Sequence, residues 1–177
     1  MKRLILLRHA KSDWSDAELH DFDRHLNKRG EKNAPAMGKR LRKLGIKPER
    51  IISSPAKRAR DTARLLARQL TILESGVVFK DAIYEAATED LLETIASIPQ
   101  ELESVMLVGH NPGLTELANL LGKLNIANLP TCAAVGLELE IKHWNKVAPG
   151  CARLKFYDYP KNPESAPLDK IPKEHKD

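Results

Sequence analysis

Residues 1–14 read MKRLILLRHAKSDW, and the abrupt change of side-chain chemistry within this stretch gives the strongest indication of the fold. Leu4 to Leu7 are four consecutive apolar residues, which is the composition of a central strand buried on both faces of a parallel sheet. Arg8 and His9 follow at once. In open α/β sheets, ligands bind outside the carboxyl ends of the strands, so this stretch predicts a strand that delivers a cation and an imidazole to a binding site.

Further apolar runs continue this pattern along the chain and alternate with helical periodicity. The expected strands are residues 3–7, 51–52, 77–79 and 105–108, followed by a pair at 133–141 and 152–157. Such alternation predicts an α/β fold, a three-layer αβα sandwich with a mostly parallel central sheet and helices on both faces. The turn-rich HWNKVAPG between the last two runs favours an antiparallel pair at the edge of that sheet.

Apolar periodicity also predicts four helices. The first is expected from near Glu31 to Leu44, with a late start or a kink because Pro35 fits badly inside a longer helix. For the second, Ser54 is the expected N-cap and Pro55 the first helical residue. The remaining two are expected to start after Thr88 and after Asn111–Gly113 and to end before Pro99 and Gly122 respectively.

The length and composition favour one soluble domain. A chain of 177 residues is long enough for one well-buried domain, here residues 1–157, and short for two. Residues 158–177 are rich in proline and lysine, have no apolar periodicity, and are expected to form an extended or mobile tail. No apolar run approaches the length of a membrane helix, and no secretory signal is evident.

Cysteine usage and charge restrict the possible partners. Cys132 and Cys151 are the only cysteines, too few for a disulfide framework and without zinc-ligand spacing, so we expect a reducing cytoplasm. The net charge of +5 is modest and no nucleic-acid-binding motif accompanies it, so neither a nucleic acid nor a membrane is an expected partner. A basic excess also fits an anionic ligand.

Candidate functional side chains follow each of the first four strands. Arg8 and His9 follow the first strand, and His110 follows the fourth. The second strand leads into the helix that carries Arg58 and Arg60, and helix geometry places both of these arginines at the edge of its buried stripe, so periodicity leaves the choice between them open. The third leads through residues 81–85. Two histidines and at least two arginines therefore converge on one sheet edge.

This group of side chains suits a tetrahedral phosphate dianion. Guanidinium groups pair with phosphate oxygens through two parallel hydrogen bonds, and the free N–H groups at a helix N-terminus add to the attraction. A neutral imidazole beside the phosphorus atom is a competent nucleophile near neutral pH. The residues themselves therefore indicate a phosphate-handling site with a candidate nucleophilic histidine.

Three motifs then resemble one family. LLRHAKS, SSPAKRARDTA and VMLVGHNPGL, in this order, resemble the Arg-His, Ser-Ser-Pro-x-x-Arg-Ala-x-x-Thr and second-histidine motifs of the histidine phosphatase superfamily, which includes phosphoglycerate mutase. DFDRHLNKRG and LPTCAAVGLEL are similar to its small bacterial branch, the phosphohistidine phosphatases of the SixA type. The resemblance covers residues 1–157 and implies the phosphoglycerate mutase-like fold.

The resemblance also implies roles for individual residues of these motifs. His9 would be the nucleophile and would form a covalent phosphohistidine, and His110 would stabilise charge on the transferring group. Arg8 and Arg58 would hold the phosphate, which favours Arg58 over Arg60.

Three further assignments follow from the same resemblance. Arg24 precedes a Leu-x-x-x-Gly segment and would also reach the phosphate. Ser12 would donate a hydrogen bond there or act as a cap. Glu85 matches an acidic position of larger relatives and would be the general acid, with an exposed carboxylate paired to an arginine as the alternative.

We therefore expect a metal-independent phosphatase without a cofactor, acting on phosphohistidine in a signalling or phosphotransfer protein. Two alternatives remain: a small-molecule phosphomonoesterase with the same chemistry, and a catalytically weak module that binds a phosphorylated partner. Asp21-Phe22-Asp23 could suggest magnesium-dependent aspartyl-phosphate chemistry, but these aspartates do not follow an apolar strand.

Overall fold

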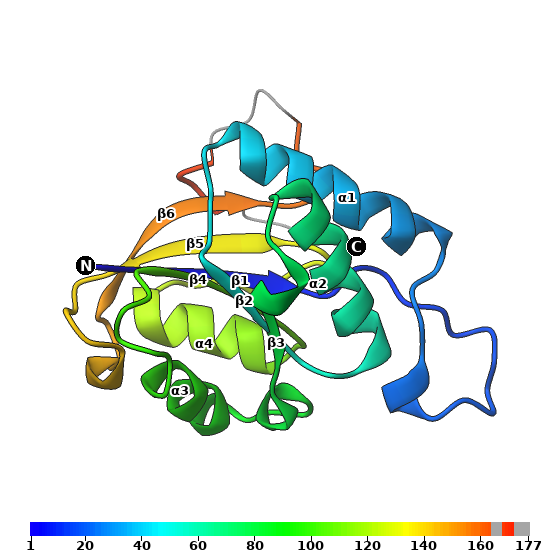
Figure 1. Ribbon diagram of the computed structural model, residues 1–177, viewed down its shortest axis with the longest axis horizontal. Helices are drawn as coiled ribbons and strands as arrows, with labels where there is room; N and C mark the ends of the chain where they lie inside the picture. The colour runs from blue at the N-terminus through cyan, green and yellow to red at the C-terminus, as the bar shows by residue number, and fades with distance from the viewer. Residues whose placement is uncertain (164–167, 172–177) are drawn as a thin grey trace.

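The computed structural model describes residues 1–163 and 168–171, and its centre is one six-stranded sheet of order β3-β2-β4-β1-β5-β6 (Figure 1). The strands are β1 (Lys2–Arg8), β2 (Arg50–Ser53), β3 (Val77–Phe79), β4 (Ser104–Gly109), β5 (Ala134–Leu139) and β6 (Ala152–Asp158). β1 to β4 pair in parallel, whereas β5 runs antiparallel to both β1 and β6. The mostly parallel sheet and its antiparallel edge pair are confirmed.

Two helices cover each face of the sheet. α1 (Lys28–Lys43) and α2 (Lys57–Gln69) lie on one face, and α3 (Thr88–Ala96) and α4 (Gly113–Gly122) lie on the other (Figure 1). β1 shows why both faces must be covered, because Leu4 and Leu6 pack into the cluster beneath α3 and α4 whereas Ile5 and Leu7 pack into the cluster beneath α1 and α2. The three-layer αβα sandwich is confirmed.

The expected start of α1 is wrong. The helix begins at Lys28 rather than near Glu31, because the side chain of Asn27 accepts a hydrogen bond from the N–H of Gly30 at 2.8 Å and caps the first turn. Pro35 consequently lies inside the helix and removes one backbone hydrogen bond. The burial of Ala34 and Met37 on either side of it offsets this loss.

The expected cap of α2 is also wrong. The helix begins at Lys57, with Ala56 in the N-cap position, so Pro55 lies outside it. The hydroxyl of Ser54 accepts from the N–H of Ala56 at 3.2 Å, but it also pairs with the imidazole of His110 at 2.7 Å. The residue that looked like a helix cap is therefore part of the edge where the strands end.

The C-terminal segment contacts the sheet over part of its length. β6 ends at Asp158, one residue beyond the expected domain boundary, and the buried carboxylate of Asp158 pairs with Arg40 at 2.6 Å. The N–H of Tyr157 donates to the carbonyl of Leu168. The rest of the expected tail, residues 164–167 and 172–177, lies outside the described residues, and the division at residue 157 stays a prediction.

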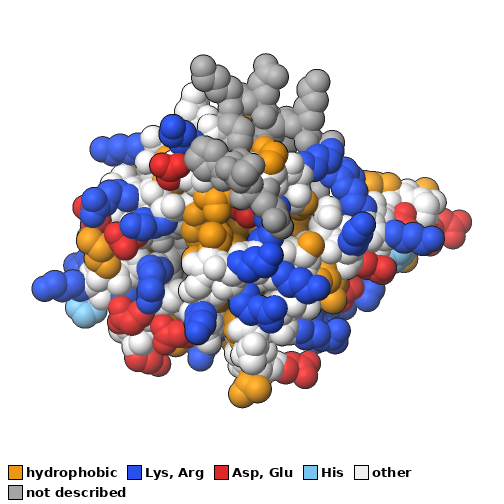
Figure 2. Space-filling view, turned by 90° about the horizontal axis from the view of Figure 1, so that it is seen from above, with side chains coloured by type: hydrophobic (Ala, Val, Ile, Leu, Met, Phe, Trp, Pro, Cys, Tyr) orange, Lys and Arg blue, Asp and Glu red, His pale blue; other side chains and the backbone are white. Residues whose placement is uncertain are grey.

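The surface, the cysteines and the lengths of the helices add three findings. Figure 2 shows Lys and Arg side chains spread over the face that carries α1, as a solvated helix face would have them. Cys132 and Cys151 are both free. None of the described helices is long and apolar enough to cross a bilayer.

Candidate active site

The loops that follow β1 and β4, the first turn of α2 and Thr131 before β5 line a cavity of about 180 Å³ at the carboxyl edge of the sheet. Six of the seven candidate site residues line it; Glu85 does not. The lining residues are Arg8, His9, Lys11, Ser12, Trp14, Arg24, Arg58, His110, Asn111 and Thr131. The cavity thus carries a high density of cations, as an anion-binding site requires.

The two histidines lie side by side because of the strand register. Arg8 at the end of β1 is paired with Gly109 at the end of β4, so the residues that follow them, His9 and His110, leave the sheet at the same level. Their ring centroids are 5.1 Å apart. A group bound in the cavity can therefore contact both imidazoles.

His9 is held in one orientation. Its Nδ1 lies 2.7 Å from the carbonyl oxygen of Ala10, and a carbonyl can only accept, so Nδ1 carries the proton and Nε2 keeps the lone pair. Thr62 fixes the backbone at His9 and Ala10, since its hydroxyl accepts a hydrogen bond from the N–H of Ala10 and donates one to the carbonyl of Arg58. Burial, followed by the positive charges of its neighbours, lowers the pKa of His9 well below its ordinary value. His9 is accordingly a neutral imidazole at pH 7.

His110 is neutral for the same reasons. Burial, and then the charge of Arg58, lower the pKa of His110 to about 4. Its Nε2 pairs with the hydroxyl of Ser54 at 2.7 Å, whereas its buried Nδ1 has no hydrogen-bond partner within the described part of the chain. A buried imidazole nitrogen without a partner is costly unless a ligand satisfies it.

Three arginines line the cavity, of which Arg24 and Arg58 are buried and Arg8 is half-buried. Arg24 and Arg58 are 8% and 5% exposed, and in residues 1–163 and 168–171 neither Nε atom has a hydrogen-bond partner. Arg8 is held by a hydrogen bond from Nη1 to the carbonyl of Leu129 at 2.7 Å. Arg60, the alternative that periodicity left open, does not line the cavity. Guanidinium donors fixed in this way suit the oxygens of a phosphate.

Asp21 joins two of these arginines, and sequence reasoning missed its place. Its carboxylate accepts from Arg24 and from Arg58, each at 3.0 Å, and from the hydroxyl of Tyr84 at 2.6 Å. Desolvation opposes the charged form, but these hydrogen bonds and the charge of Arg58 outweigh it and hold the pKa of Asp21 well below its ordinary value. Asp21 thus stays ionised and fixes the guanidinium groups beside the cavity.

Ser12 and Tyr84 complete the surroundings. The buried Ser12 accepts a hydrogen bond from Nη1 of Arg24, so it orients that arginine. The ring of Tyr84 packs edge-on against that of His110, with 5.6 Å between the ring centroids. Burial, followed by the hydrogen bond to Asp21, raises the pKa of Tyr84 to about 12. Tyr84 therefore keeps its proton at neutral pH.

Glu85 does not line the cavity. Its side chain is exposed, and its backbone adopts a left-handed conformation with φ of 53°. The role of Glu85 as general acid stays a prediction. Tyr84, the residue before it, is the one that contacts His110, and the sequence carried no signal for Tyr84 beyond its place next to Glu85.

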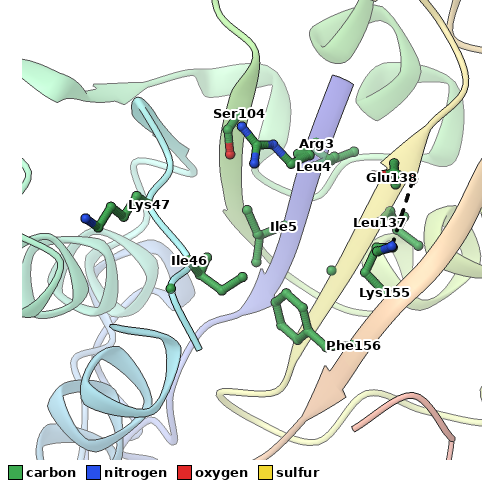
Figure 3. Close-up of a pocket in the computed structure, with 12 residues that line it drawn as sticks. Arg3, Leu4, Ile5, Ile46, Lys47, Ser104, Leu137, Glu138, Lys155 and Phe156 are labelled. Carbon is green, nitrogen blue, oxygen red and sulfur yellow. Dashed lines mark ion pairs between the residues drawn. The ribbon is translucent and has the colours of Figure 1, made fainter. Parts of the chain in front are cut away.

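A second, larger cavity of about 370 Å³ lies at the amino ends of the parallel strands (Figure 3). Ile5 and Phe156 line its apolar floor, and Lys155 at its rim pairs with Glu138 at 4.0 Å. Since neither histidine borders it, this cavity lacks the groups that phosphate chemistry needs.

Comparison with known proteins indicates one family. The family model of the histidine phosphatase superfamily (branch 1) matches residues 4–101. An uncharacterized chloroplastic protein of Arabidopsis thaliana is 37% identical over 82% of this chain and 70% of its own length. An uncharacterized protein of Mycobacterium tuberculosis is 30% identical over 88% of this chain and 100% of its own.

A solved structure is also similar. It is that of the protein assigned as the phosphohistidine phosphatase SixA of Agrobacterium tumefaciens, which is 32% identical to this chain. The TM-score is 0.74, and the match covers 90% of this chain and 98% of that one. The resemblance that the motifs indicate is therefore confirmed at the level of the whole fold.

Proposed function

Because the chain belongs to branch 1 of the histidine phosphatase superfamily and is a phosphatase with a histidine-based mechanism, we propose that it removes the phosphoryl group from phosphohistidine in another protein, without a metal ion. The observation that carries this proposal is the placement of His9 and His110, 5.1 Å apart, in a small cavity lined by buried arginines. In this proposal the phosphorylated partner is a phosphotransfer protein, and the reaction takes place in the cytoplasm.

The reaction begins with His9. The lone pair on Nε2 forms a bond to phosphorus while the bond from phosphorus to the leaving atom breaks, and the leaving group keeps that electron pair and takes up a proton. A water oxygen then bonds to the phosphorus and the phosphorus–Nε2 bond breaks. The products are inorganic phosphate and the neutral imidazole of His9, ready for another cycle.

The arginines and His110 supply positive charge and hydrogen bonds. Phosphoryl transfer requires mainly positioning and stabilisation of charge on the equatorial oxygens. Arg8, Arg24 and Arg58 can donate to these oxygens, and the buried Nδ1 of His110 gains a partner when the anion is bound. Three fixed guanidinium groups provide the charge for which other phosphatases use a metal ion, which supports metal independence.

The size of the cavity favours a protein substrate. Pockets that enclose a whole small molecule usually measure about 300–1,000 Å³. The cavity beside His9 is about 180 Å³, which accommodates a phosphoryl group and the ring attached to it and leaves the rest of the substrate outside. A phosphorus–nitrogen bond also needs less help from an acid than a phosphate ester does, which suits a cavity that Glu85 does not border.

One observation favours a second candidate, a small-molecule phosphomonoesterase. The polar side chains of Asn111 and Thr131 line the same cavity and could bind hydroxyl groups of a small substrate. Comparison of kcat/KM for a panel of sugar phosphates and nucleotides with that for a phosphohistidine protein separates the two. A higher kcat/KM for any small phosphate ester than for the phosphohistidine protein would contradict the proposal of a protein substrate.

The direct test uses a histidine-phosphorylated protein in the presence of EDTA. Release of phosphate by the unaltered protein, and its loss in His9→Ala, is the expected result. Rapid quenching and mass spectrometry should then find one phosphoryl group on His9. Release that depends on added Mg²⁺, or that persists in His9→Ala, would contradict the proposal.

A further inference from the structure

Residues 14–23 form a loop that borders the cavity and is exposed at every position. The loop projects beyond the carboxyl edge of the sheet (Figure 1). Its base is closed by a bridge between Ser12 and Leu26 and by a hydrogen bond of 2.8 Å from the N–H of Asp13 to the carbonyl of His25. The loop is therefore anchored at both ends to residues of the site, and what binds to it is held beside the cavity.

Large apolar side chains are concentrated on this loop. Trp14, Leu19 and Phe22 are 72%, 39% and 37% exposed, and they make up half of the exposed large apolar residues in the described part of the chain. Single exposed apolar residues are ordinary, but three within nine positions beside a binding cavity mark a surface that another molecule covers.

Trp14 is already fixed for such contact. One side of its indole packs on the guanidinium of Arg24, with 3.6 Å from the guanidinium carbon to the ring centroid, while most of the side chain stays in water. A rigid aromatic side chain binds at a low cost in conformational entropy, as in other protein interfaces. Because Trp14 also lines the cavity, the phosphoryl group and the surface that presents it can be contacted together.

The charge of the loop is opposite to that of the cavity. Asp16, Glu18 and Asp23 are exposed on the loop, whereas Arg8, Arg24 and Arg58 line the cavity. A partner that fits both must place an anionic group in the cavity and cationic groups against the loop. This describes a phosphorylated side chain that projects from a basic surface.

We propose that residues 14–23 are the docking surface for the phosphorylated protein, and that this partner presents apolar and basic side chains around its phosphorylated residue. The inference rests on the proposed function. It extends that function because it assigns recognition of the protein to the exposed side chains of this loop, in addition to the role of Asp21 in fixing Arg24 and Arg58.

The test compares two double variants. Glu18→Lys with Leu19→Ser changes the loop and leaves the cavity-lining residues intact. Leu73→Ser with Glu74→Lys is the matched control, because it makes the same exchanges at exposed positions of the 3-10 turn before β3, near the amino ends of the parallel strands. The probes are phosphoramidate and a small folded basic protein that lacks tryptophan and carries phosphohistidine, with and without prior acetylation of its lysines.

The loop variant should lower kcat/KM for the basic phosphoprotein at least fivefold and change that for phosphoramidate less than twofold. The control variant should change neither, and acetylation of the phosphoprotein should produce most of the same loss with the unaltered enzyme. Equal kcat/KM of the loop and control variants on the phosphoprotein would overturn the docking proposal, and so would an equal loss on both probes. Inactivity of the unaltered protein on both probes would instead overturn the proposed function, together with the inference that rests on it.

A binding measurement gives a second readout that does not need turnover. Trp144 is fully buried, so acrylamide quenching of tryptophan fluorescence in His9→Ala reports mainly on Trp14. The phosphoprotein should protect Trp14 from the quencher, and lack of protection at saturation would contradict docking at the loop. If sedimentation instead shows that Glu18→Lys with Leu19→Ser converts a dimer to a monomer, the loop binds a second copy of this chain and the proposal is wrong.

Discussion

The cavity at the carboxyl edge of the sheet and the larger cavity at the amino edge differ in the chemical character of the residues that line them. The first contains buried guanidinium and imidazole groups, and Nε of Arg58 and Nδ1 of His110 have no hydrogen-bond partner in the described residues. The second has an apolar floor at Ile5 and Phe156. The imidazole and guanidinium groups that line one cavity together, rather than volume, therefore identify the reactive site in this molecule.

The largest difference between the cavities should appear in His9→Ala. Removal of the nucleophile should lower kcat by about 10⁴-fold or more, because the other groups cannot form the covalent intermediate. Lys155→Ala at the rim of the larger cavity is the control and should change kcat less than twofold. A comparable loss in Lys155→Ala would mean that the two cavities are coupled.

The next difference concerns pH. Since burial lowers the pKa of His110 to about 4 from an ordinary value near 6.5, the unfolded chain binds a proton at this position that the folded protein excludes. The free energy of unfolding therefore has its full value above about pH 6.5 and falls between about pH 6.5 and 4, by on the order of 3 kcal/mol for His110 alone. His9 adds a loss of the same sign.

Urea unfolding at a series of pH values measures this. His110→Gln should flatten the dependence of the free energy of unfolding on pH between 6.5 and 4. Lys155→Ala should leave the slope as it is, because no buried histidine borders the larger cavity. An unchanged slope in His110→Gln would show that His110 is readily protonated in the folded protein.

Substitutions at the two cavities should differ by a smaller factor in their effect on the affinity for an oxyanion. Arg58→Ala removes a buried guanidinium whose charge-assisted hydrogen bonds to an oxyanion contribute about 2–3 kcal/mol, so tungstate should bind about 30- to 150-fold more weakly. Isothermal titration calorimetry measures the affinity. Lys155→Ala should not change it, and Arg60→Ala, beside Arg58 but outside the cavity, is the second control.

The strand-end rule accounts for how much of this site could be predicted from the sequence. Buried strands and their parallel order place His9 and His110 at the same edge, since the register of β1 on β4 leaves little choice. The fold, the two-sided core, both histidines and Arg8 depend on local patterns of this kind, whereas Arg24 was indicated by the resemblance alone. Only the resemblance, and then the structure, distinguished Arg58 from Arg60.

The contacts that could not be predicted are those between side chains far apart in the sequence. Asp21 meets Arg58 and Tyr84 across 37 and 63 positions of sequence, and no periodicity encodes such a meeting. Ser54 matched the pattern of a helix cap, but its hydroxyl pairs with His110. Tertiary hydrogen bonds override local preference at the site, where a polar side chain has several possible partners.

The smallest expected differences come from two glycines, one near each cavity. At Gly136 an added Cβ would meet the ring of Phe156 at 2.0 Å, so Gly136→Ala should destabilise the protein by about 1–3 kcal/mol. Since Phe156 borders only the larger cavity, kcat/KM of the folded variant should stay within twofold of the unaltered value. Thermal unfolding and kinetics measured on the same sample check both statements.

Gly30→Ala is the matched change beside the reactive site. An added Cβ there would lie 2.1 Å from the carbonyl oxygen of Lys11, a backbone atom that cannot move without shifting the turn that carries His9 and Ser12. Stability should fall by a similar amount, about 1–3 kcal/mol, but kcat should now fall with it. If the two alanine variants lose stability equally and both keep full kcat, the turn after β1 tolerates displacement, and the positions of His9 and Arg24 do not depend on the close approach of α1.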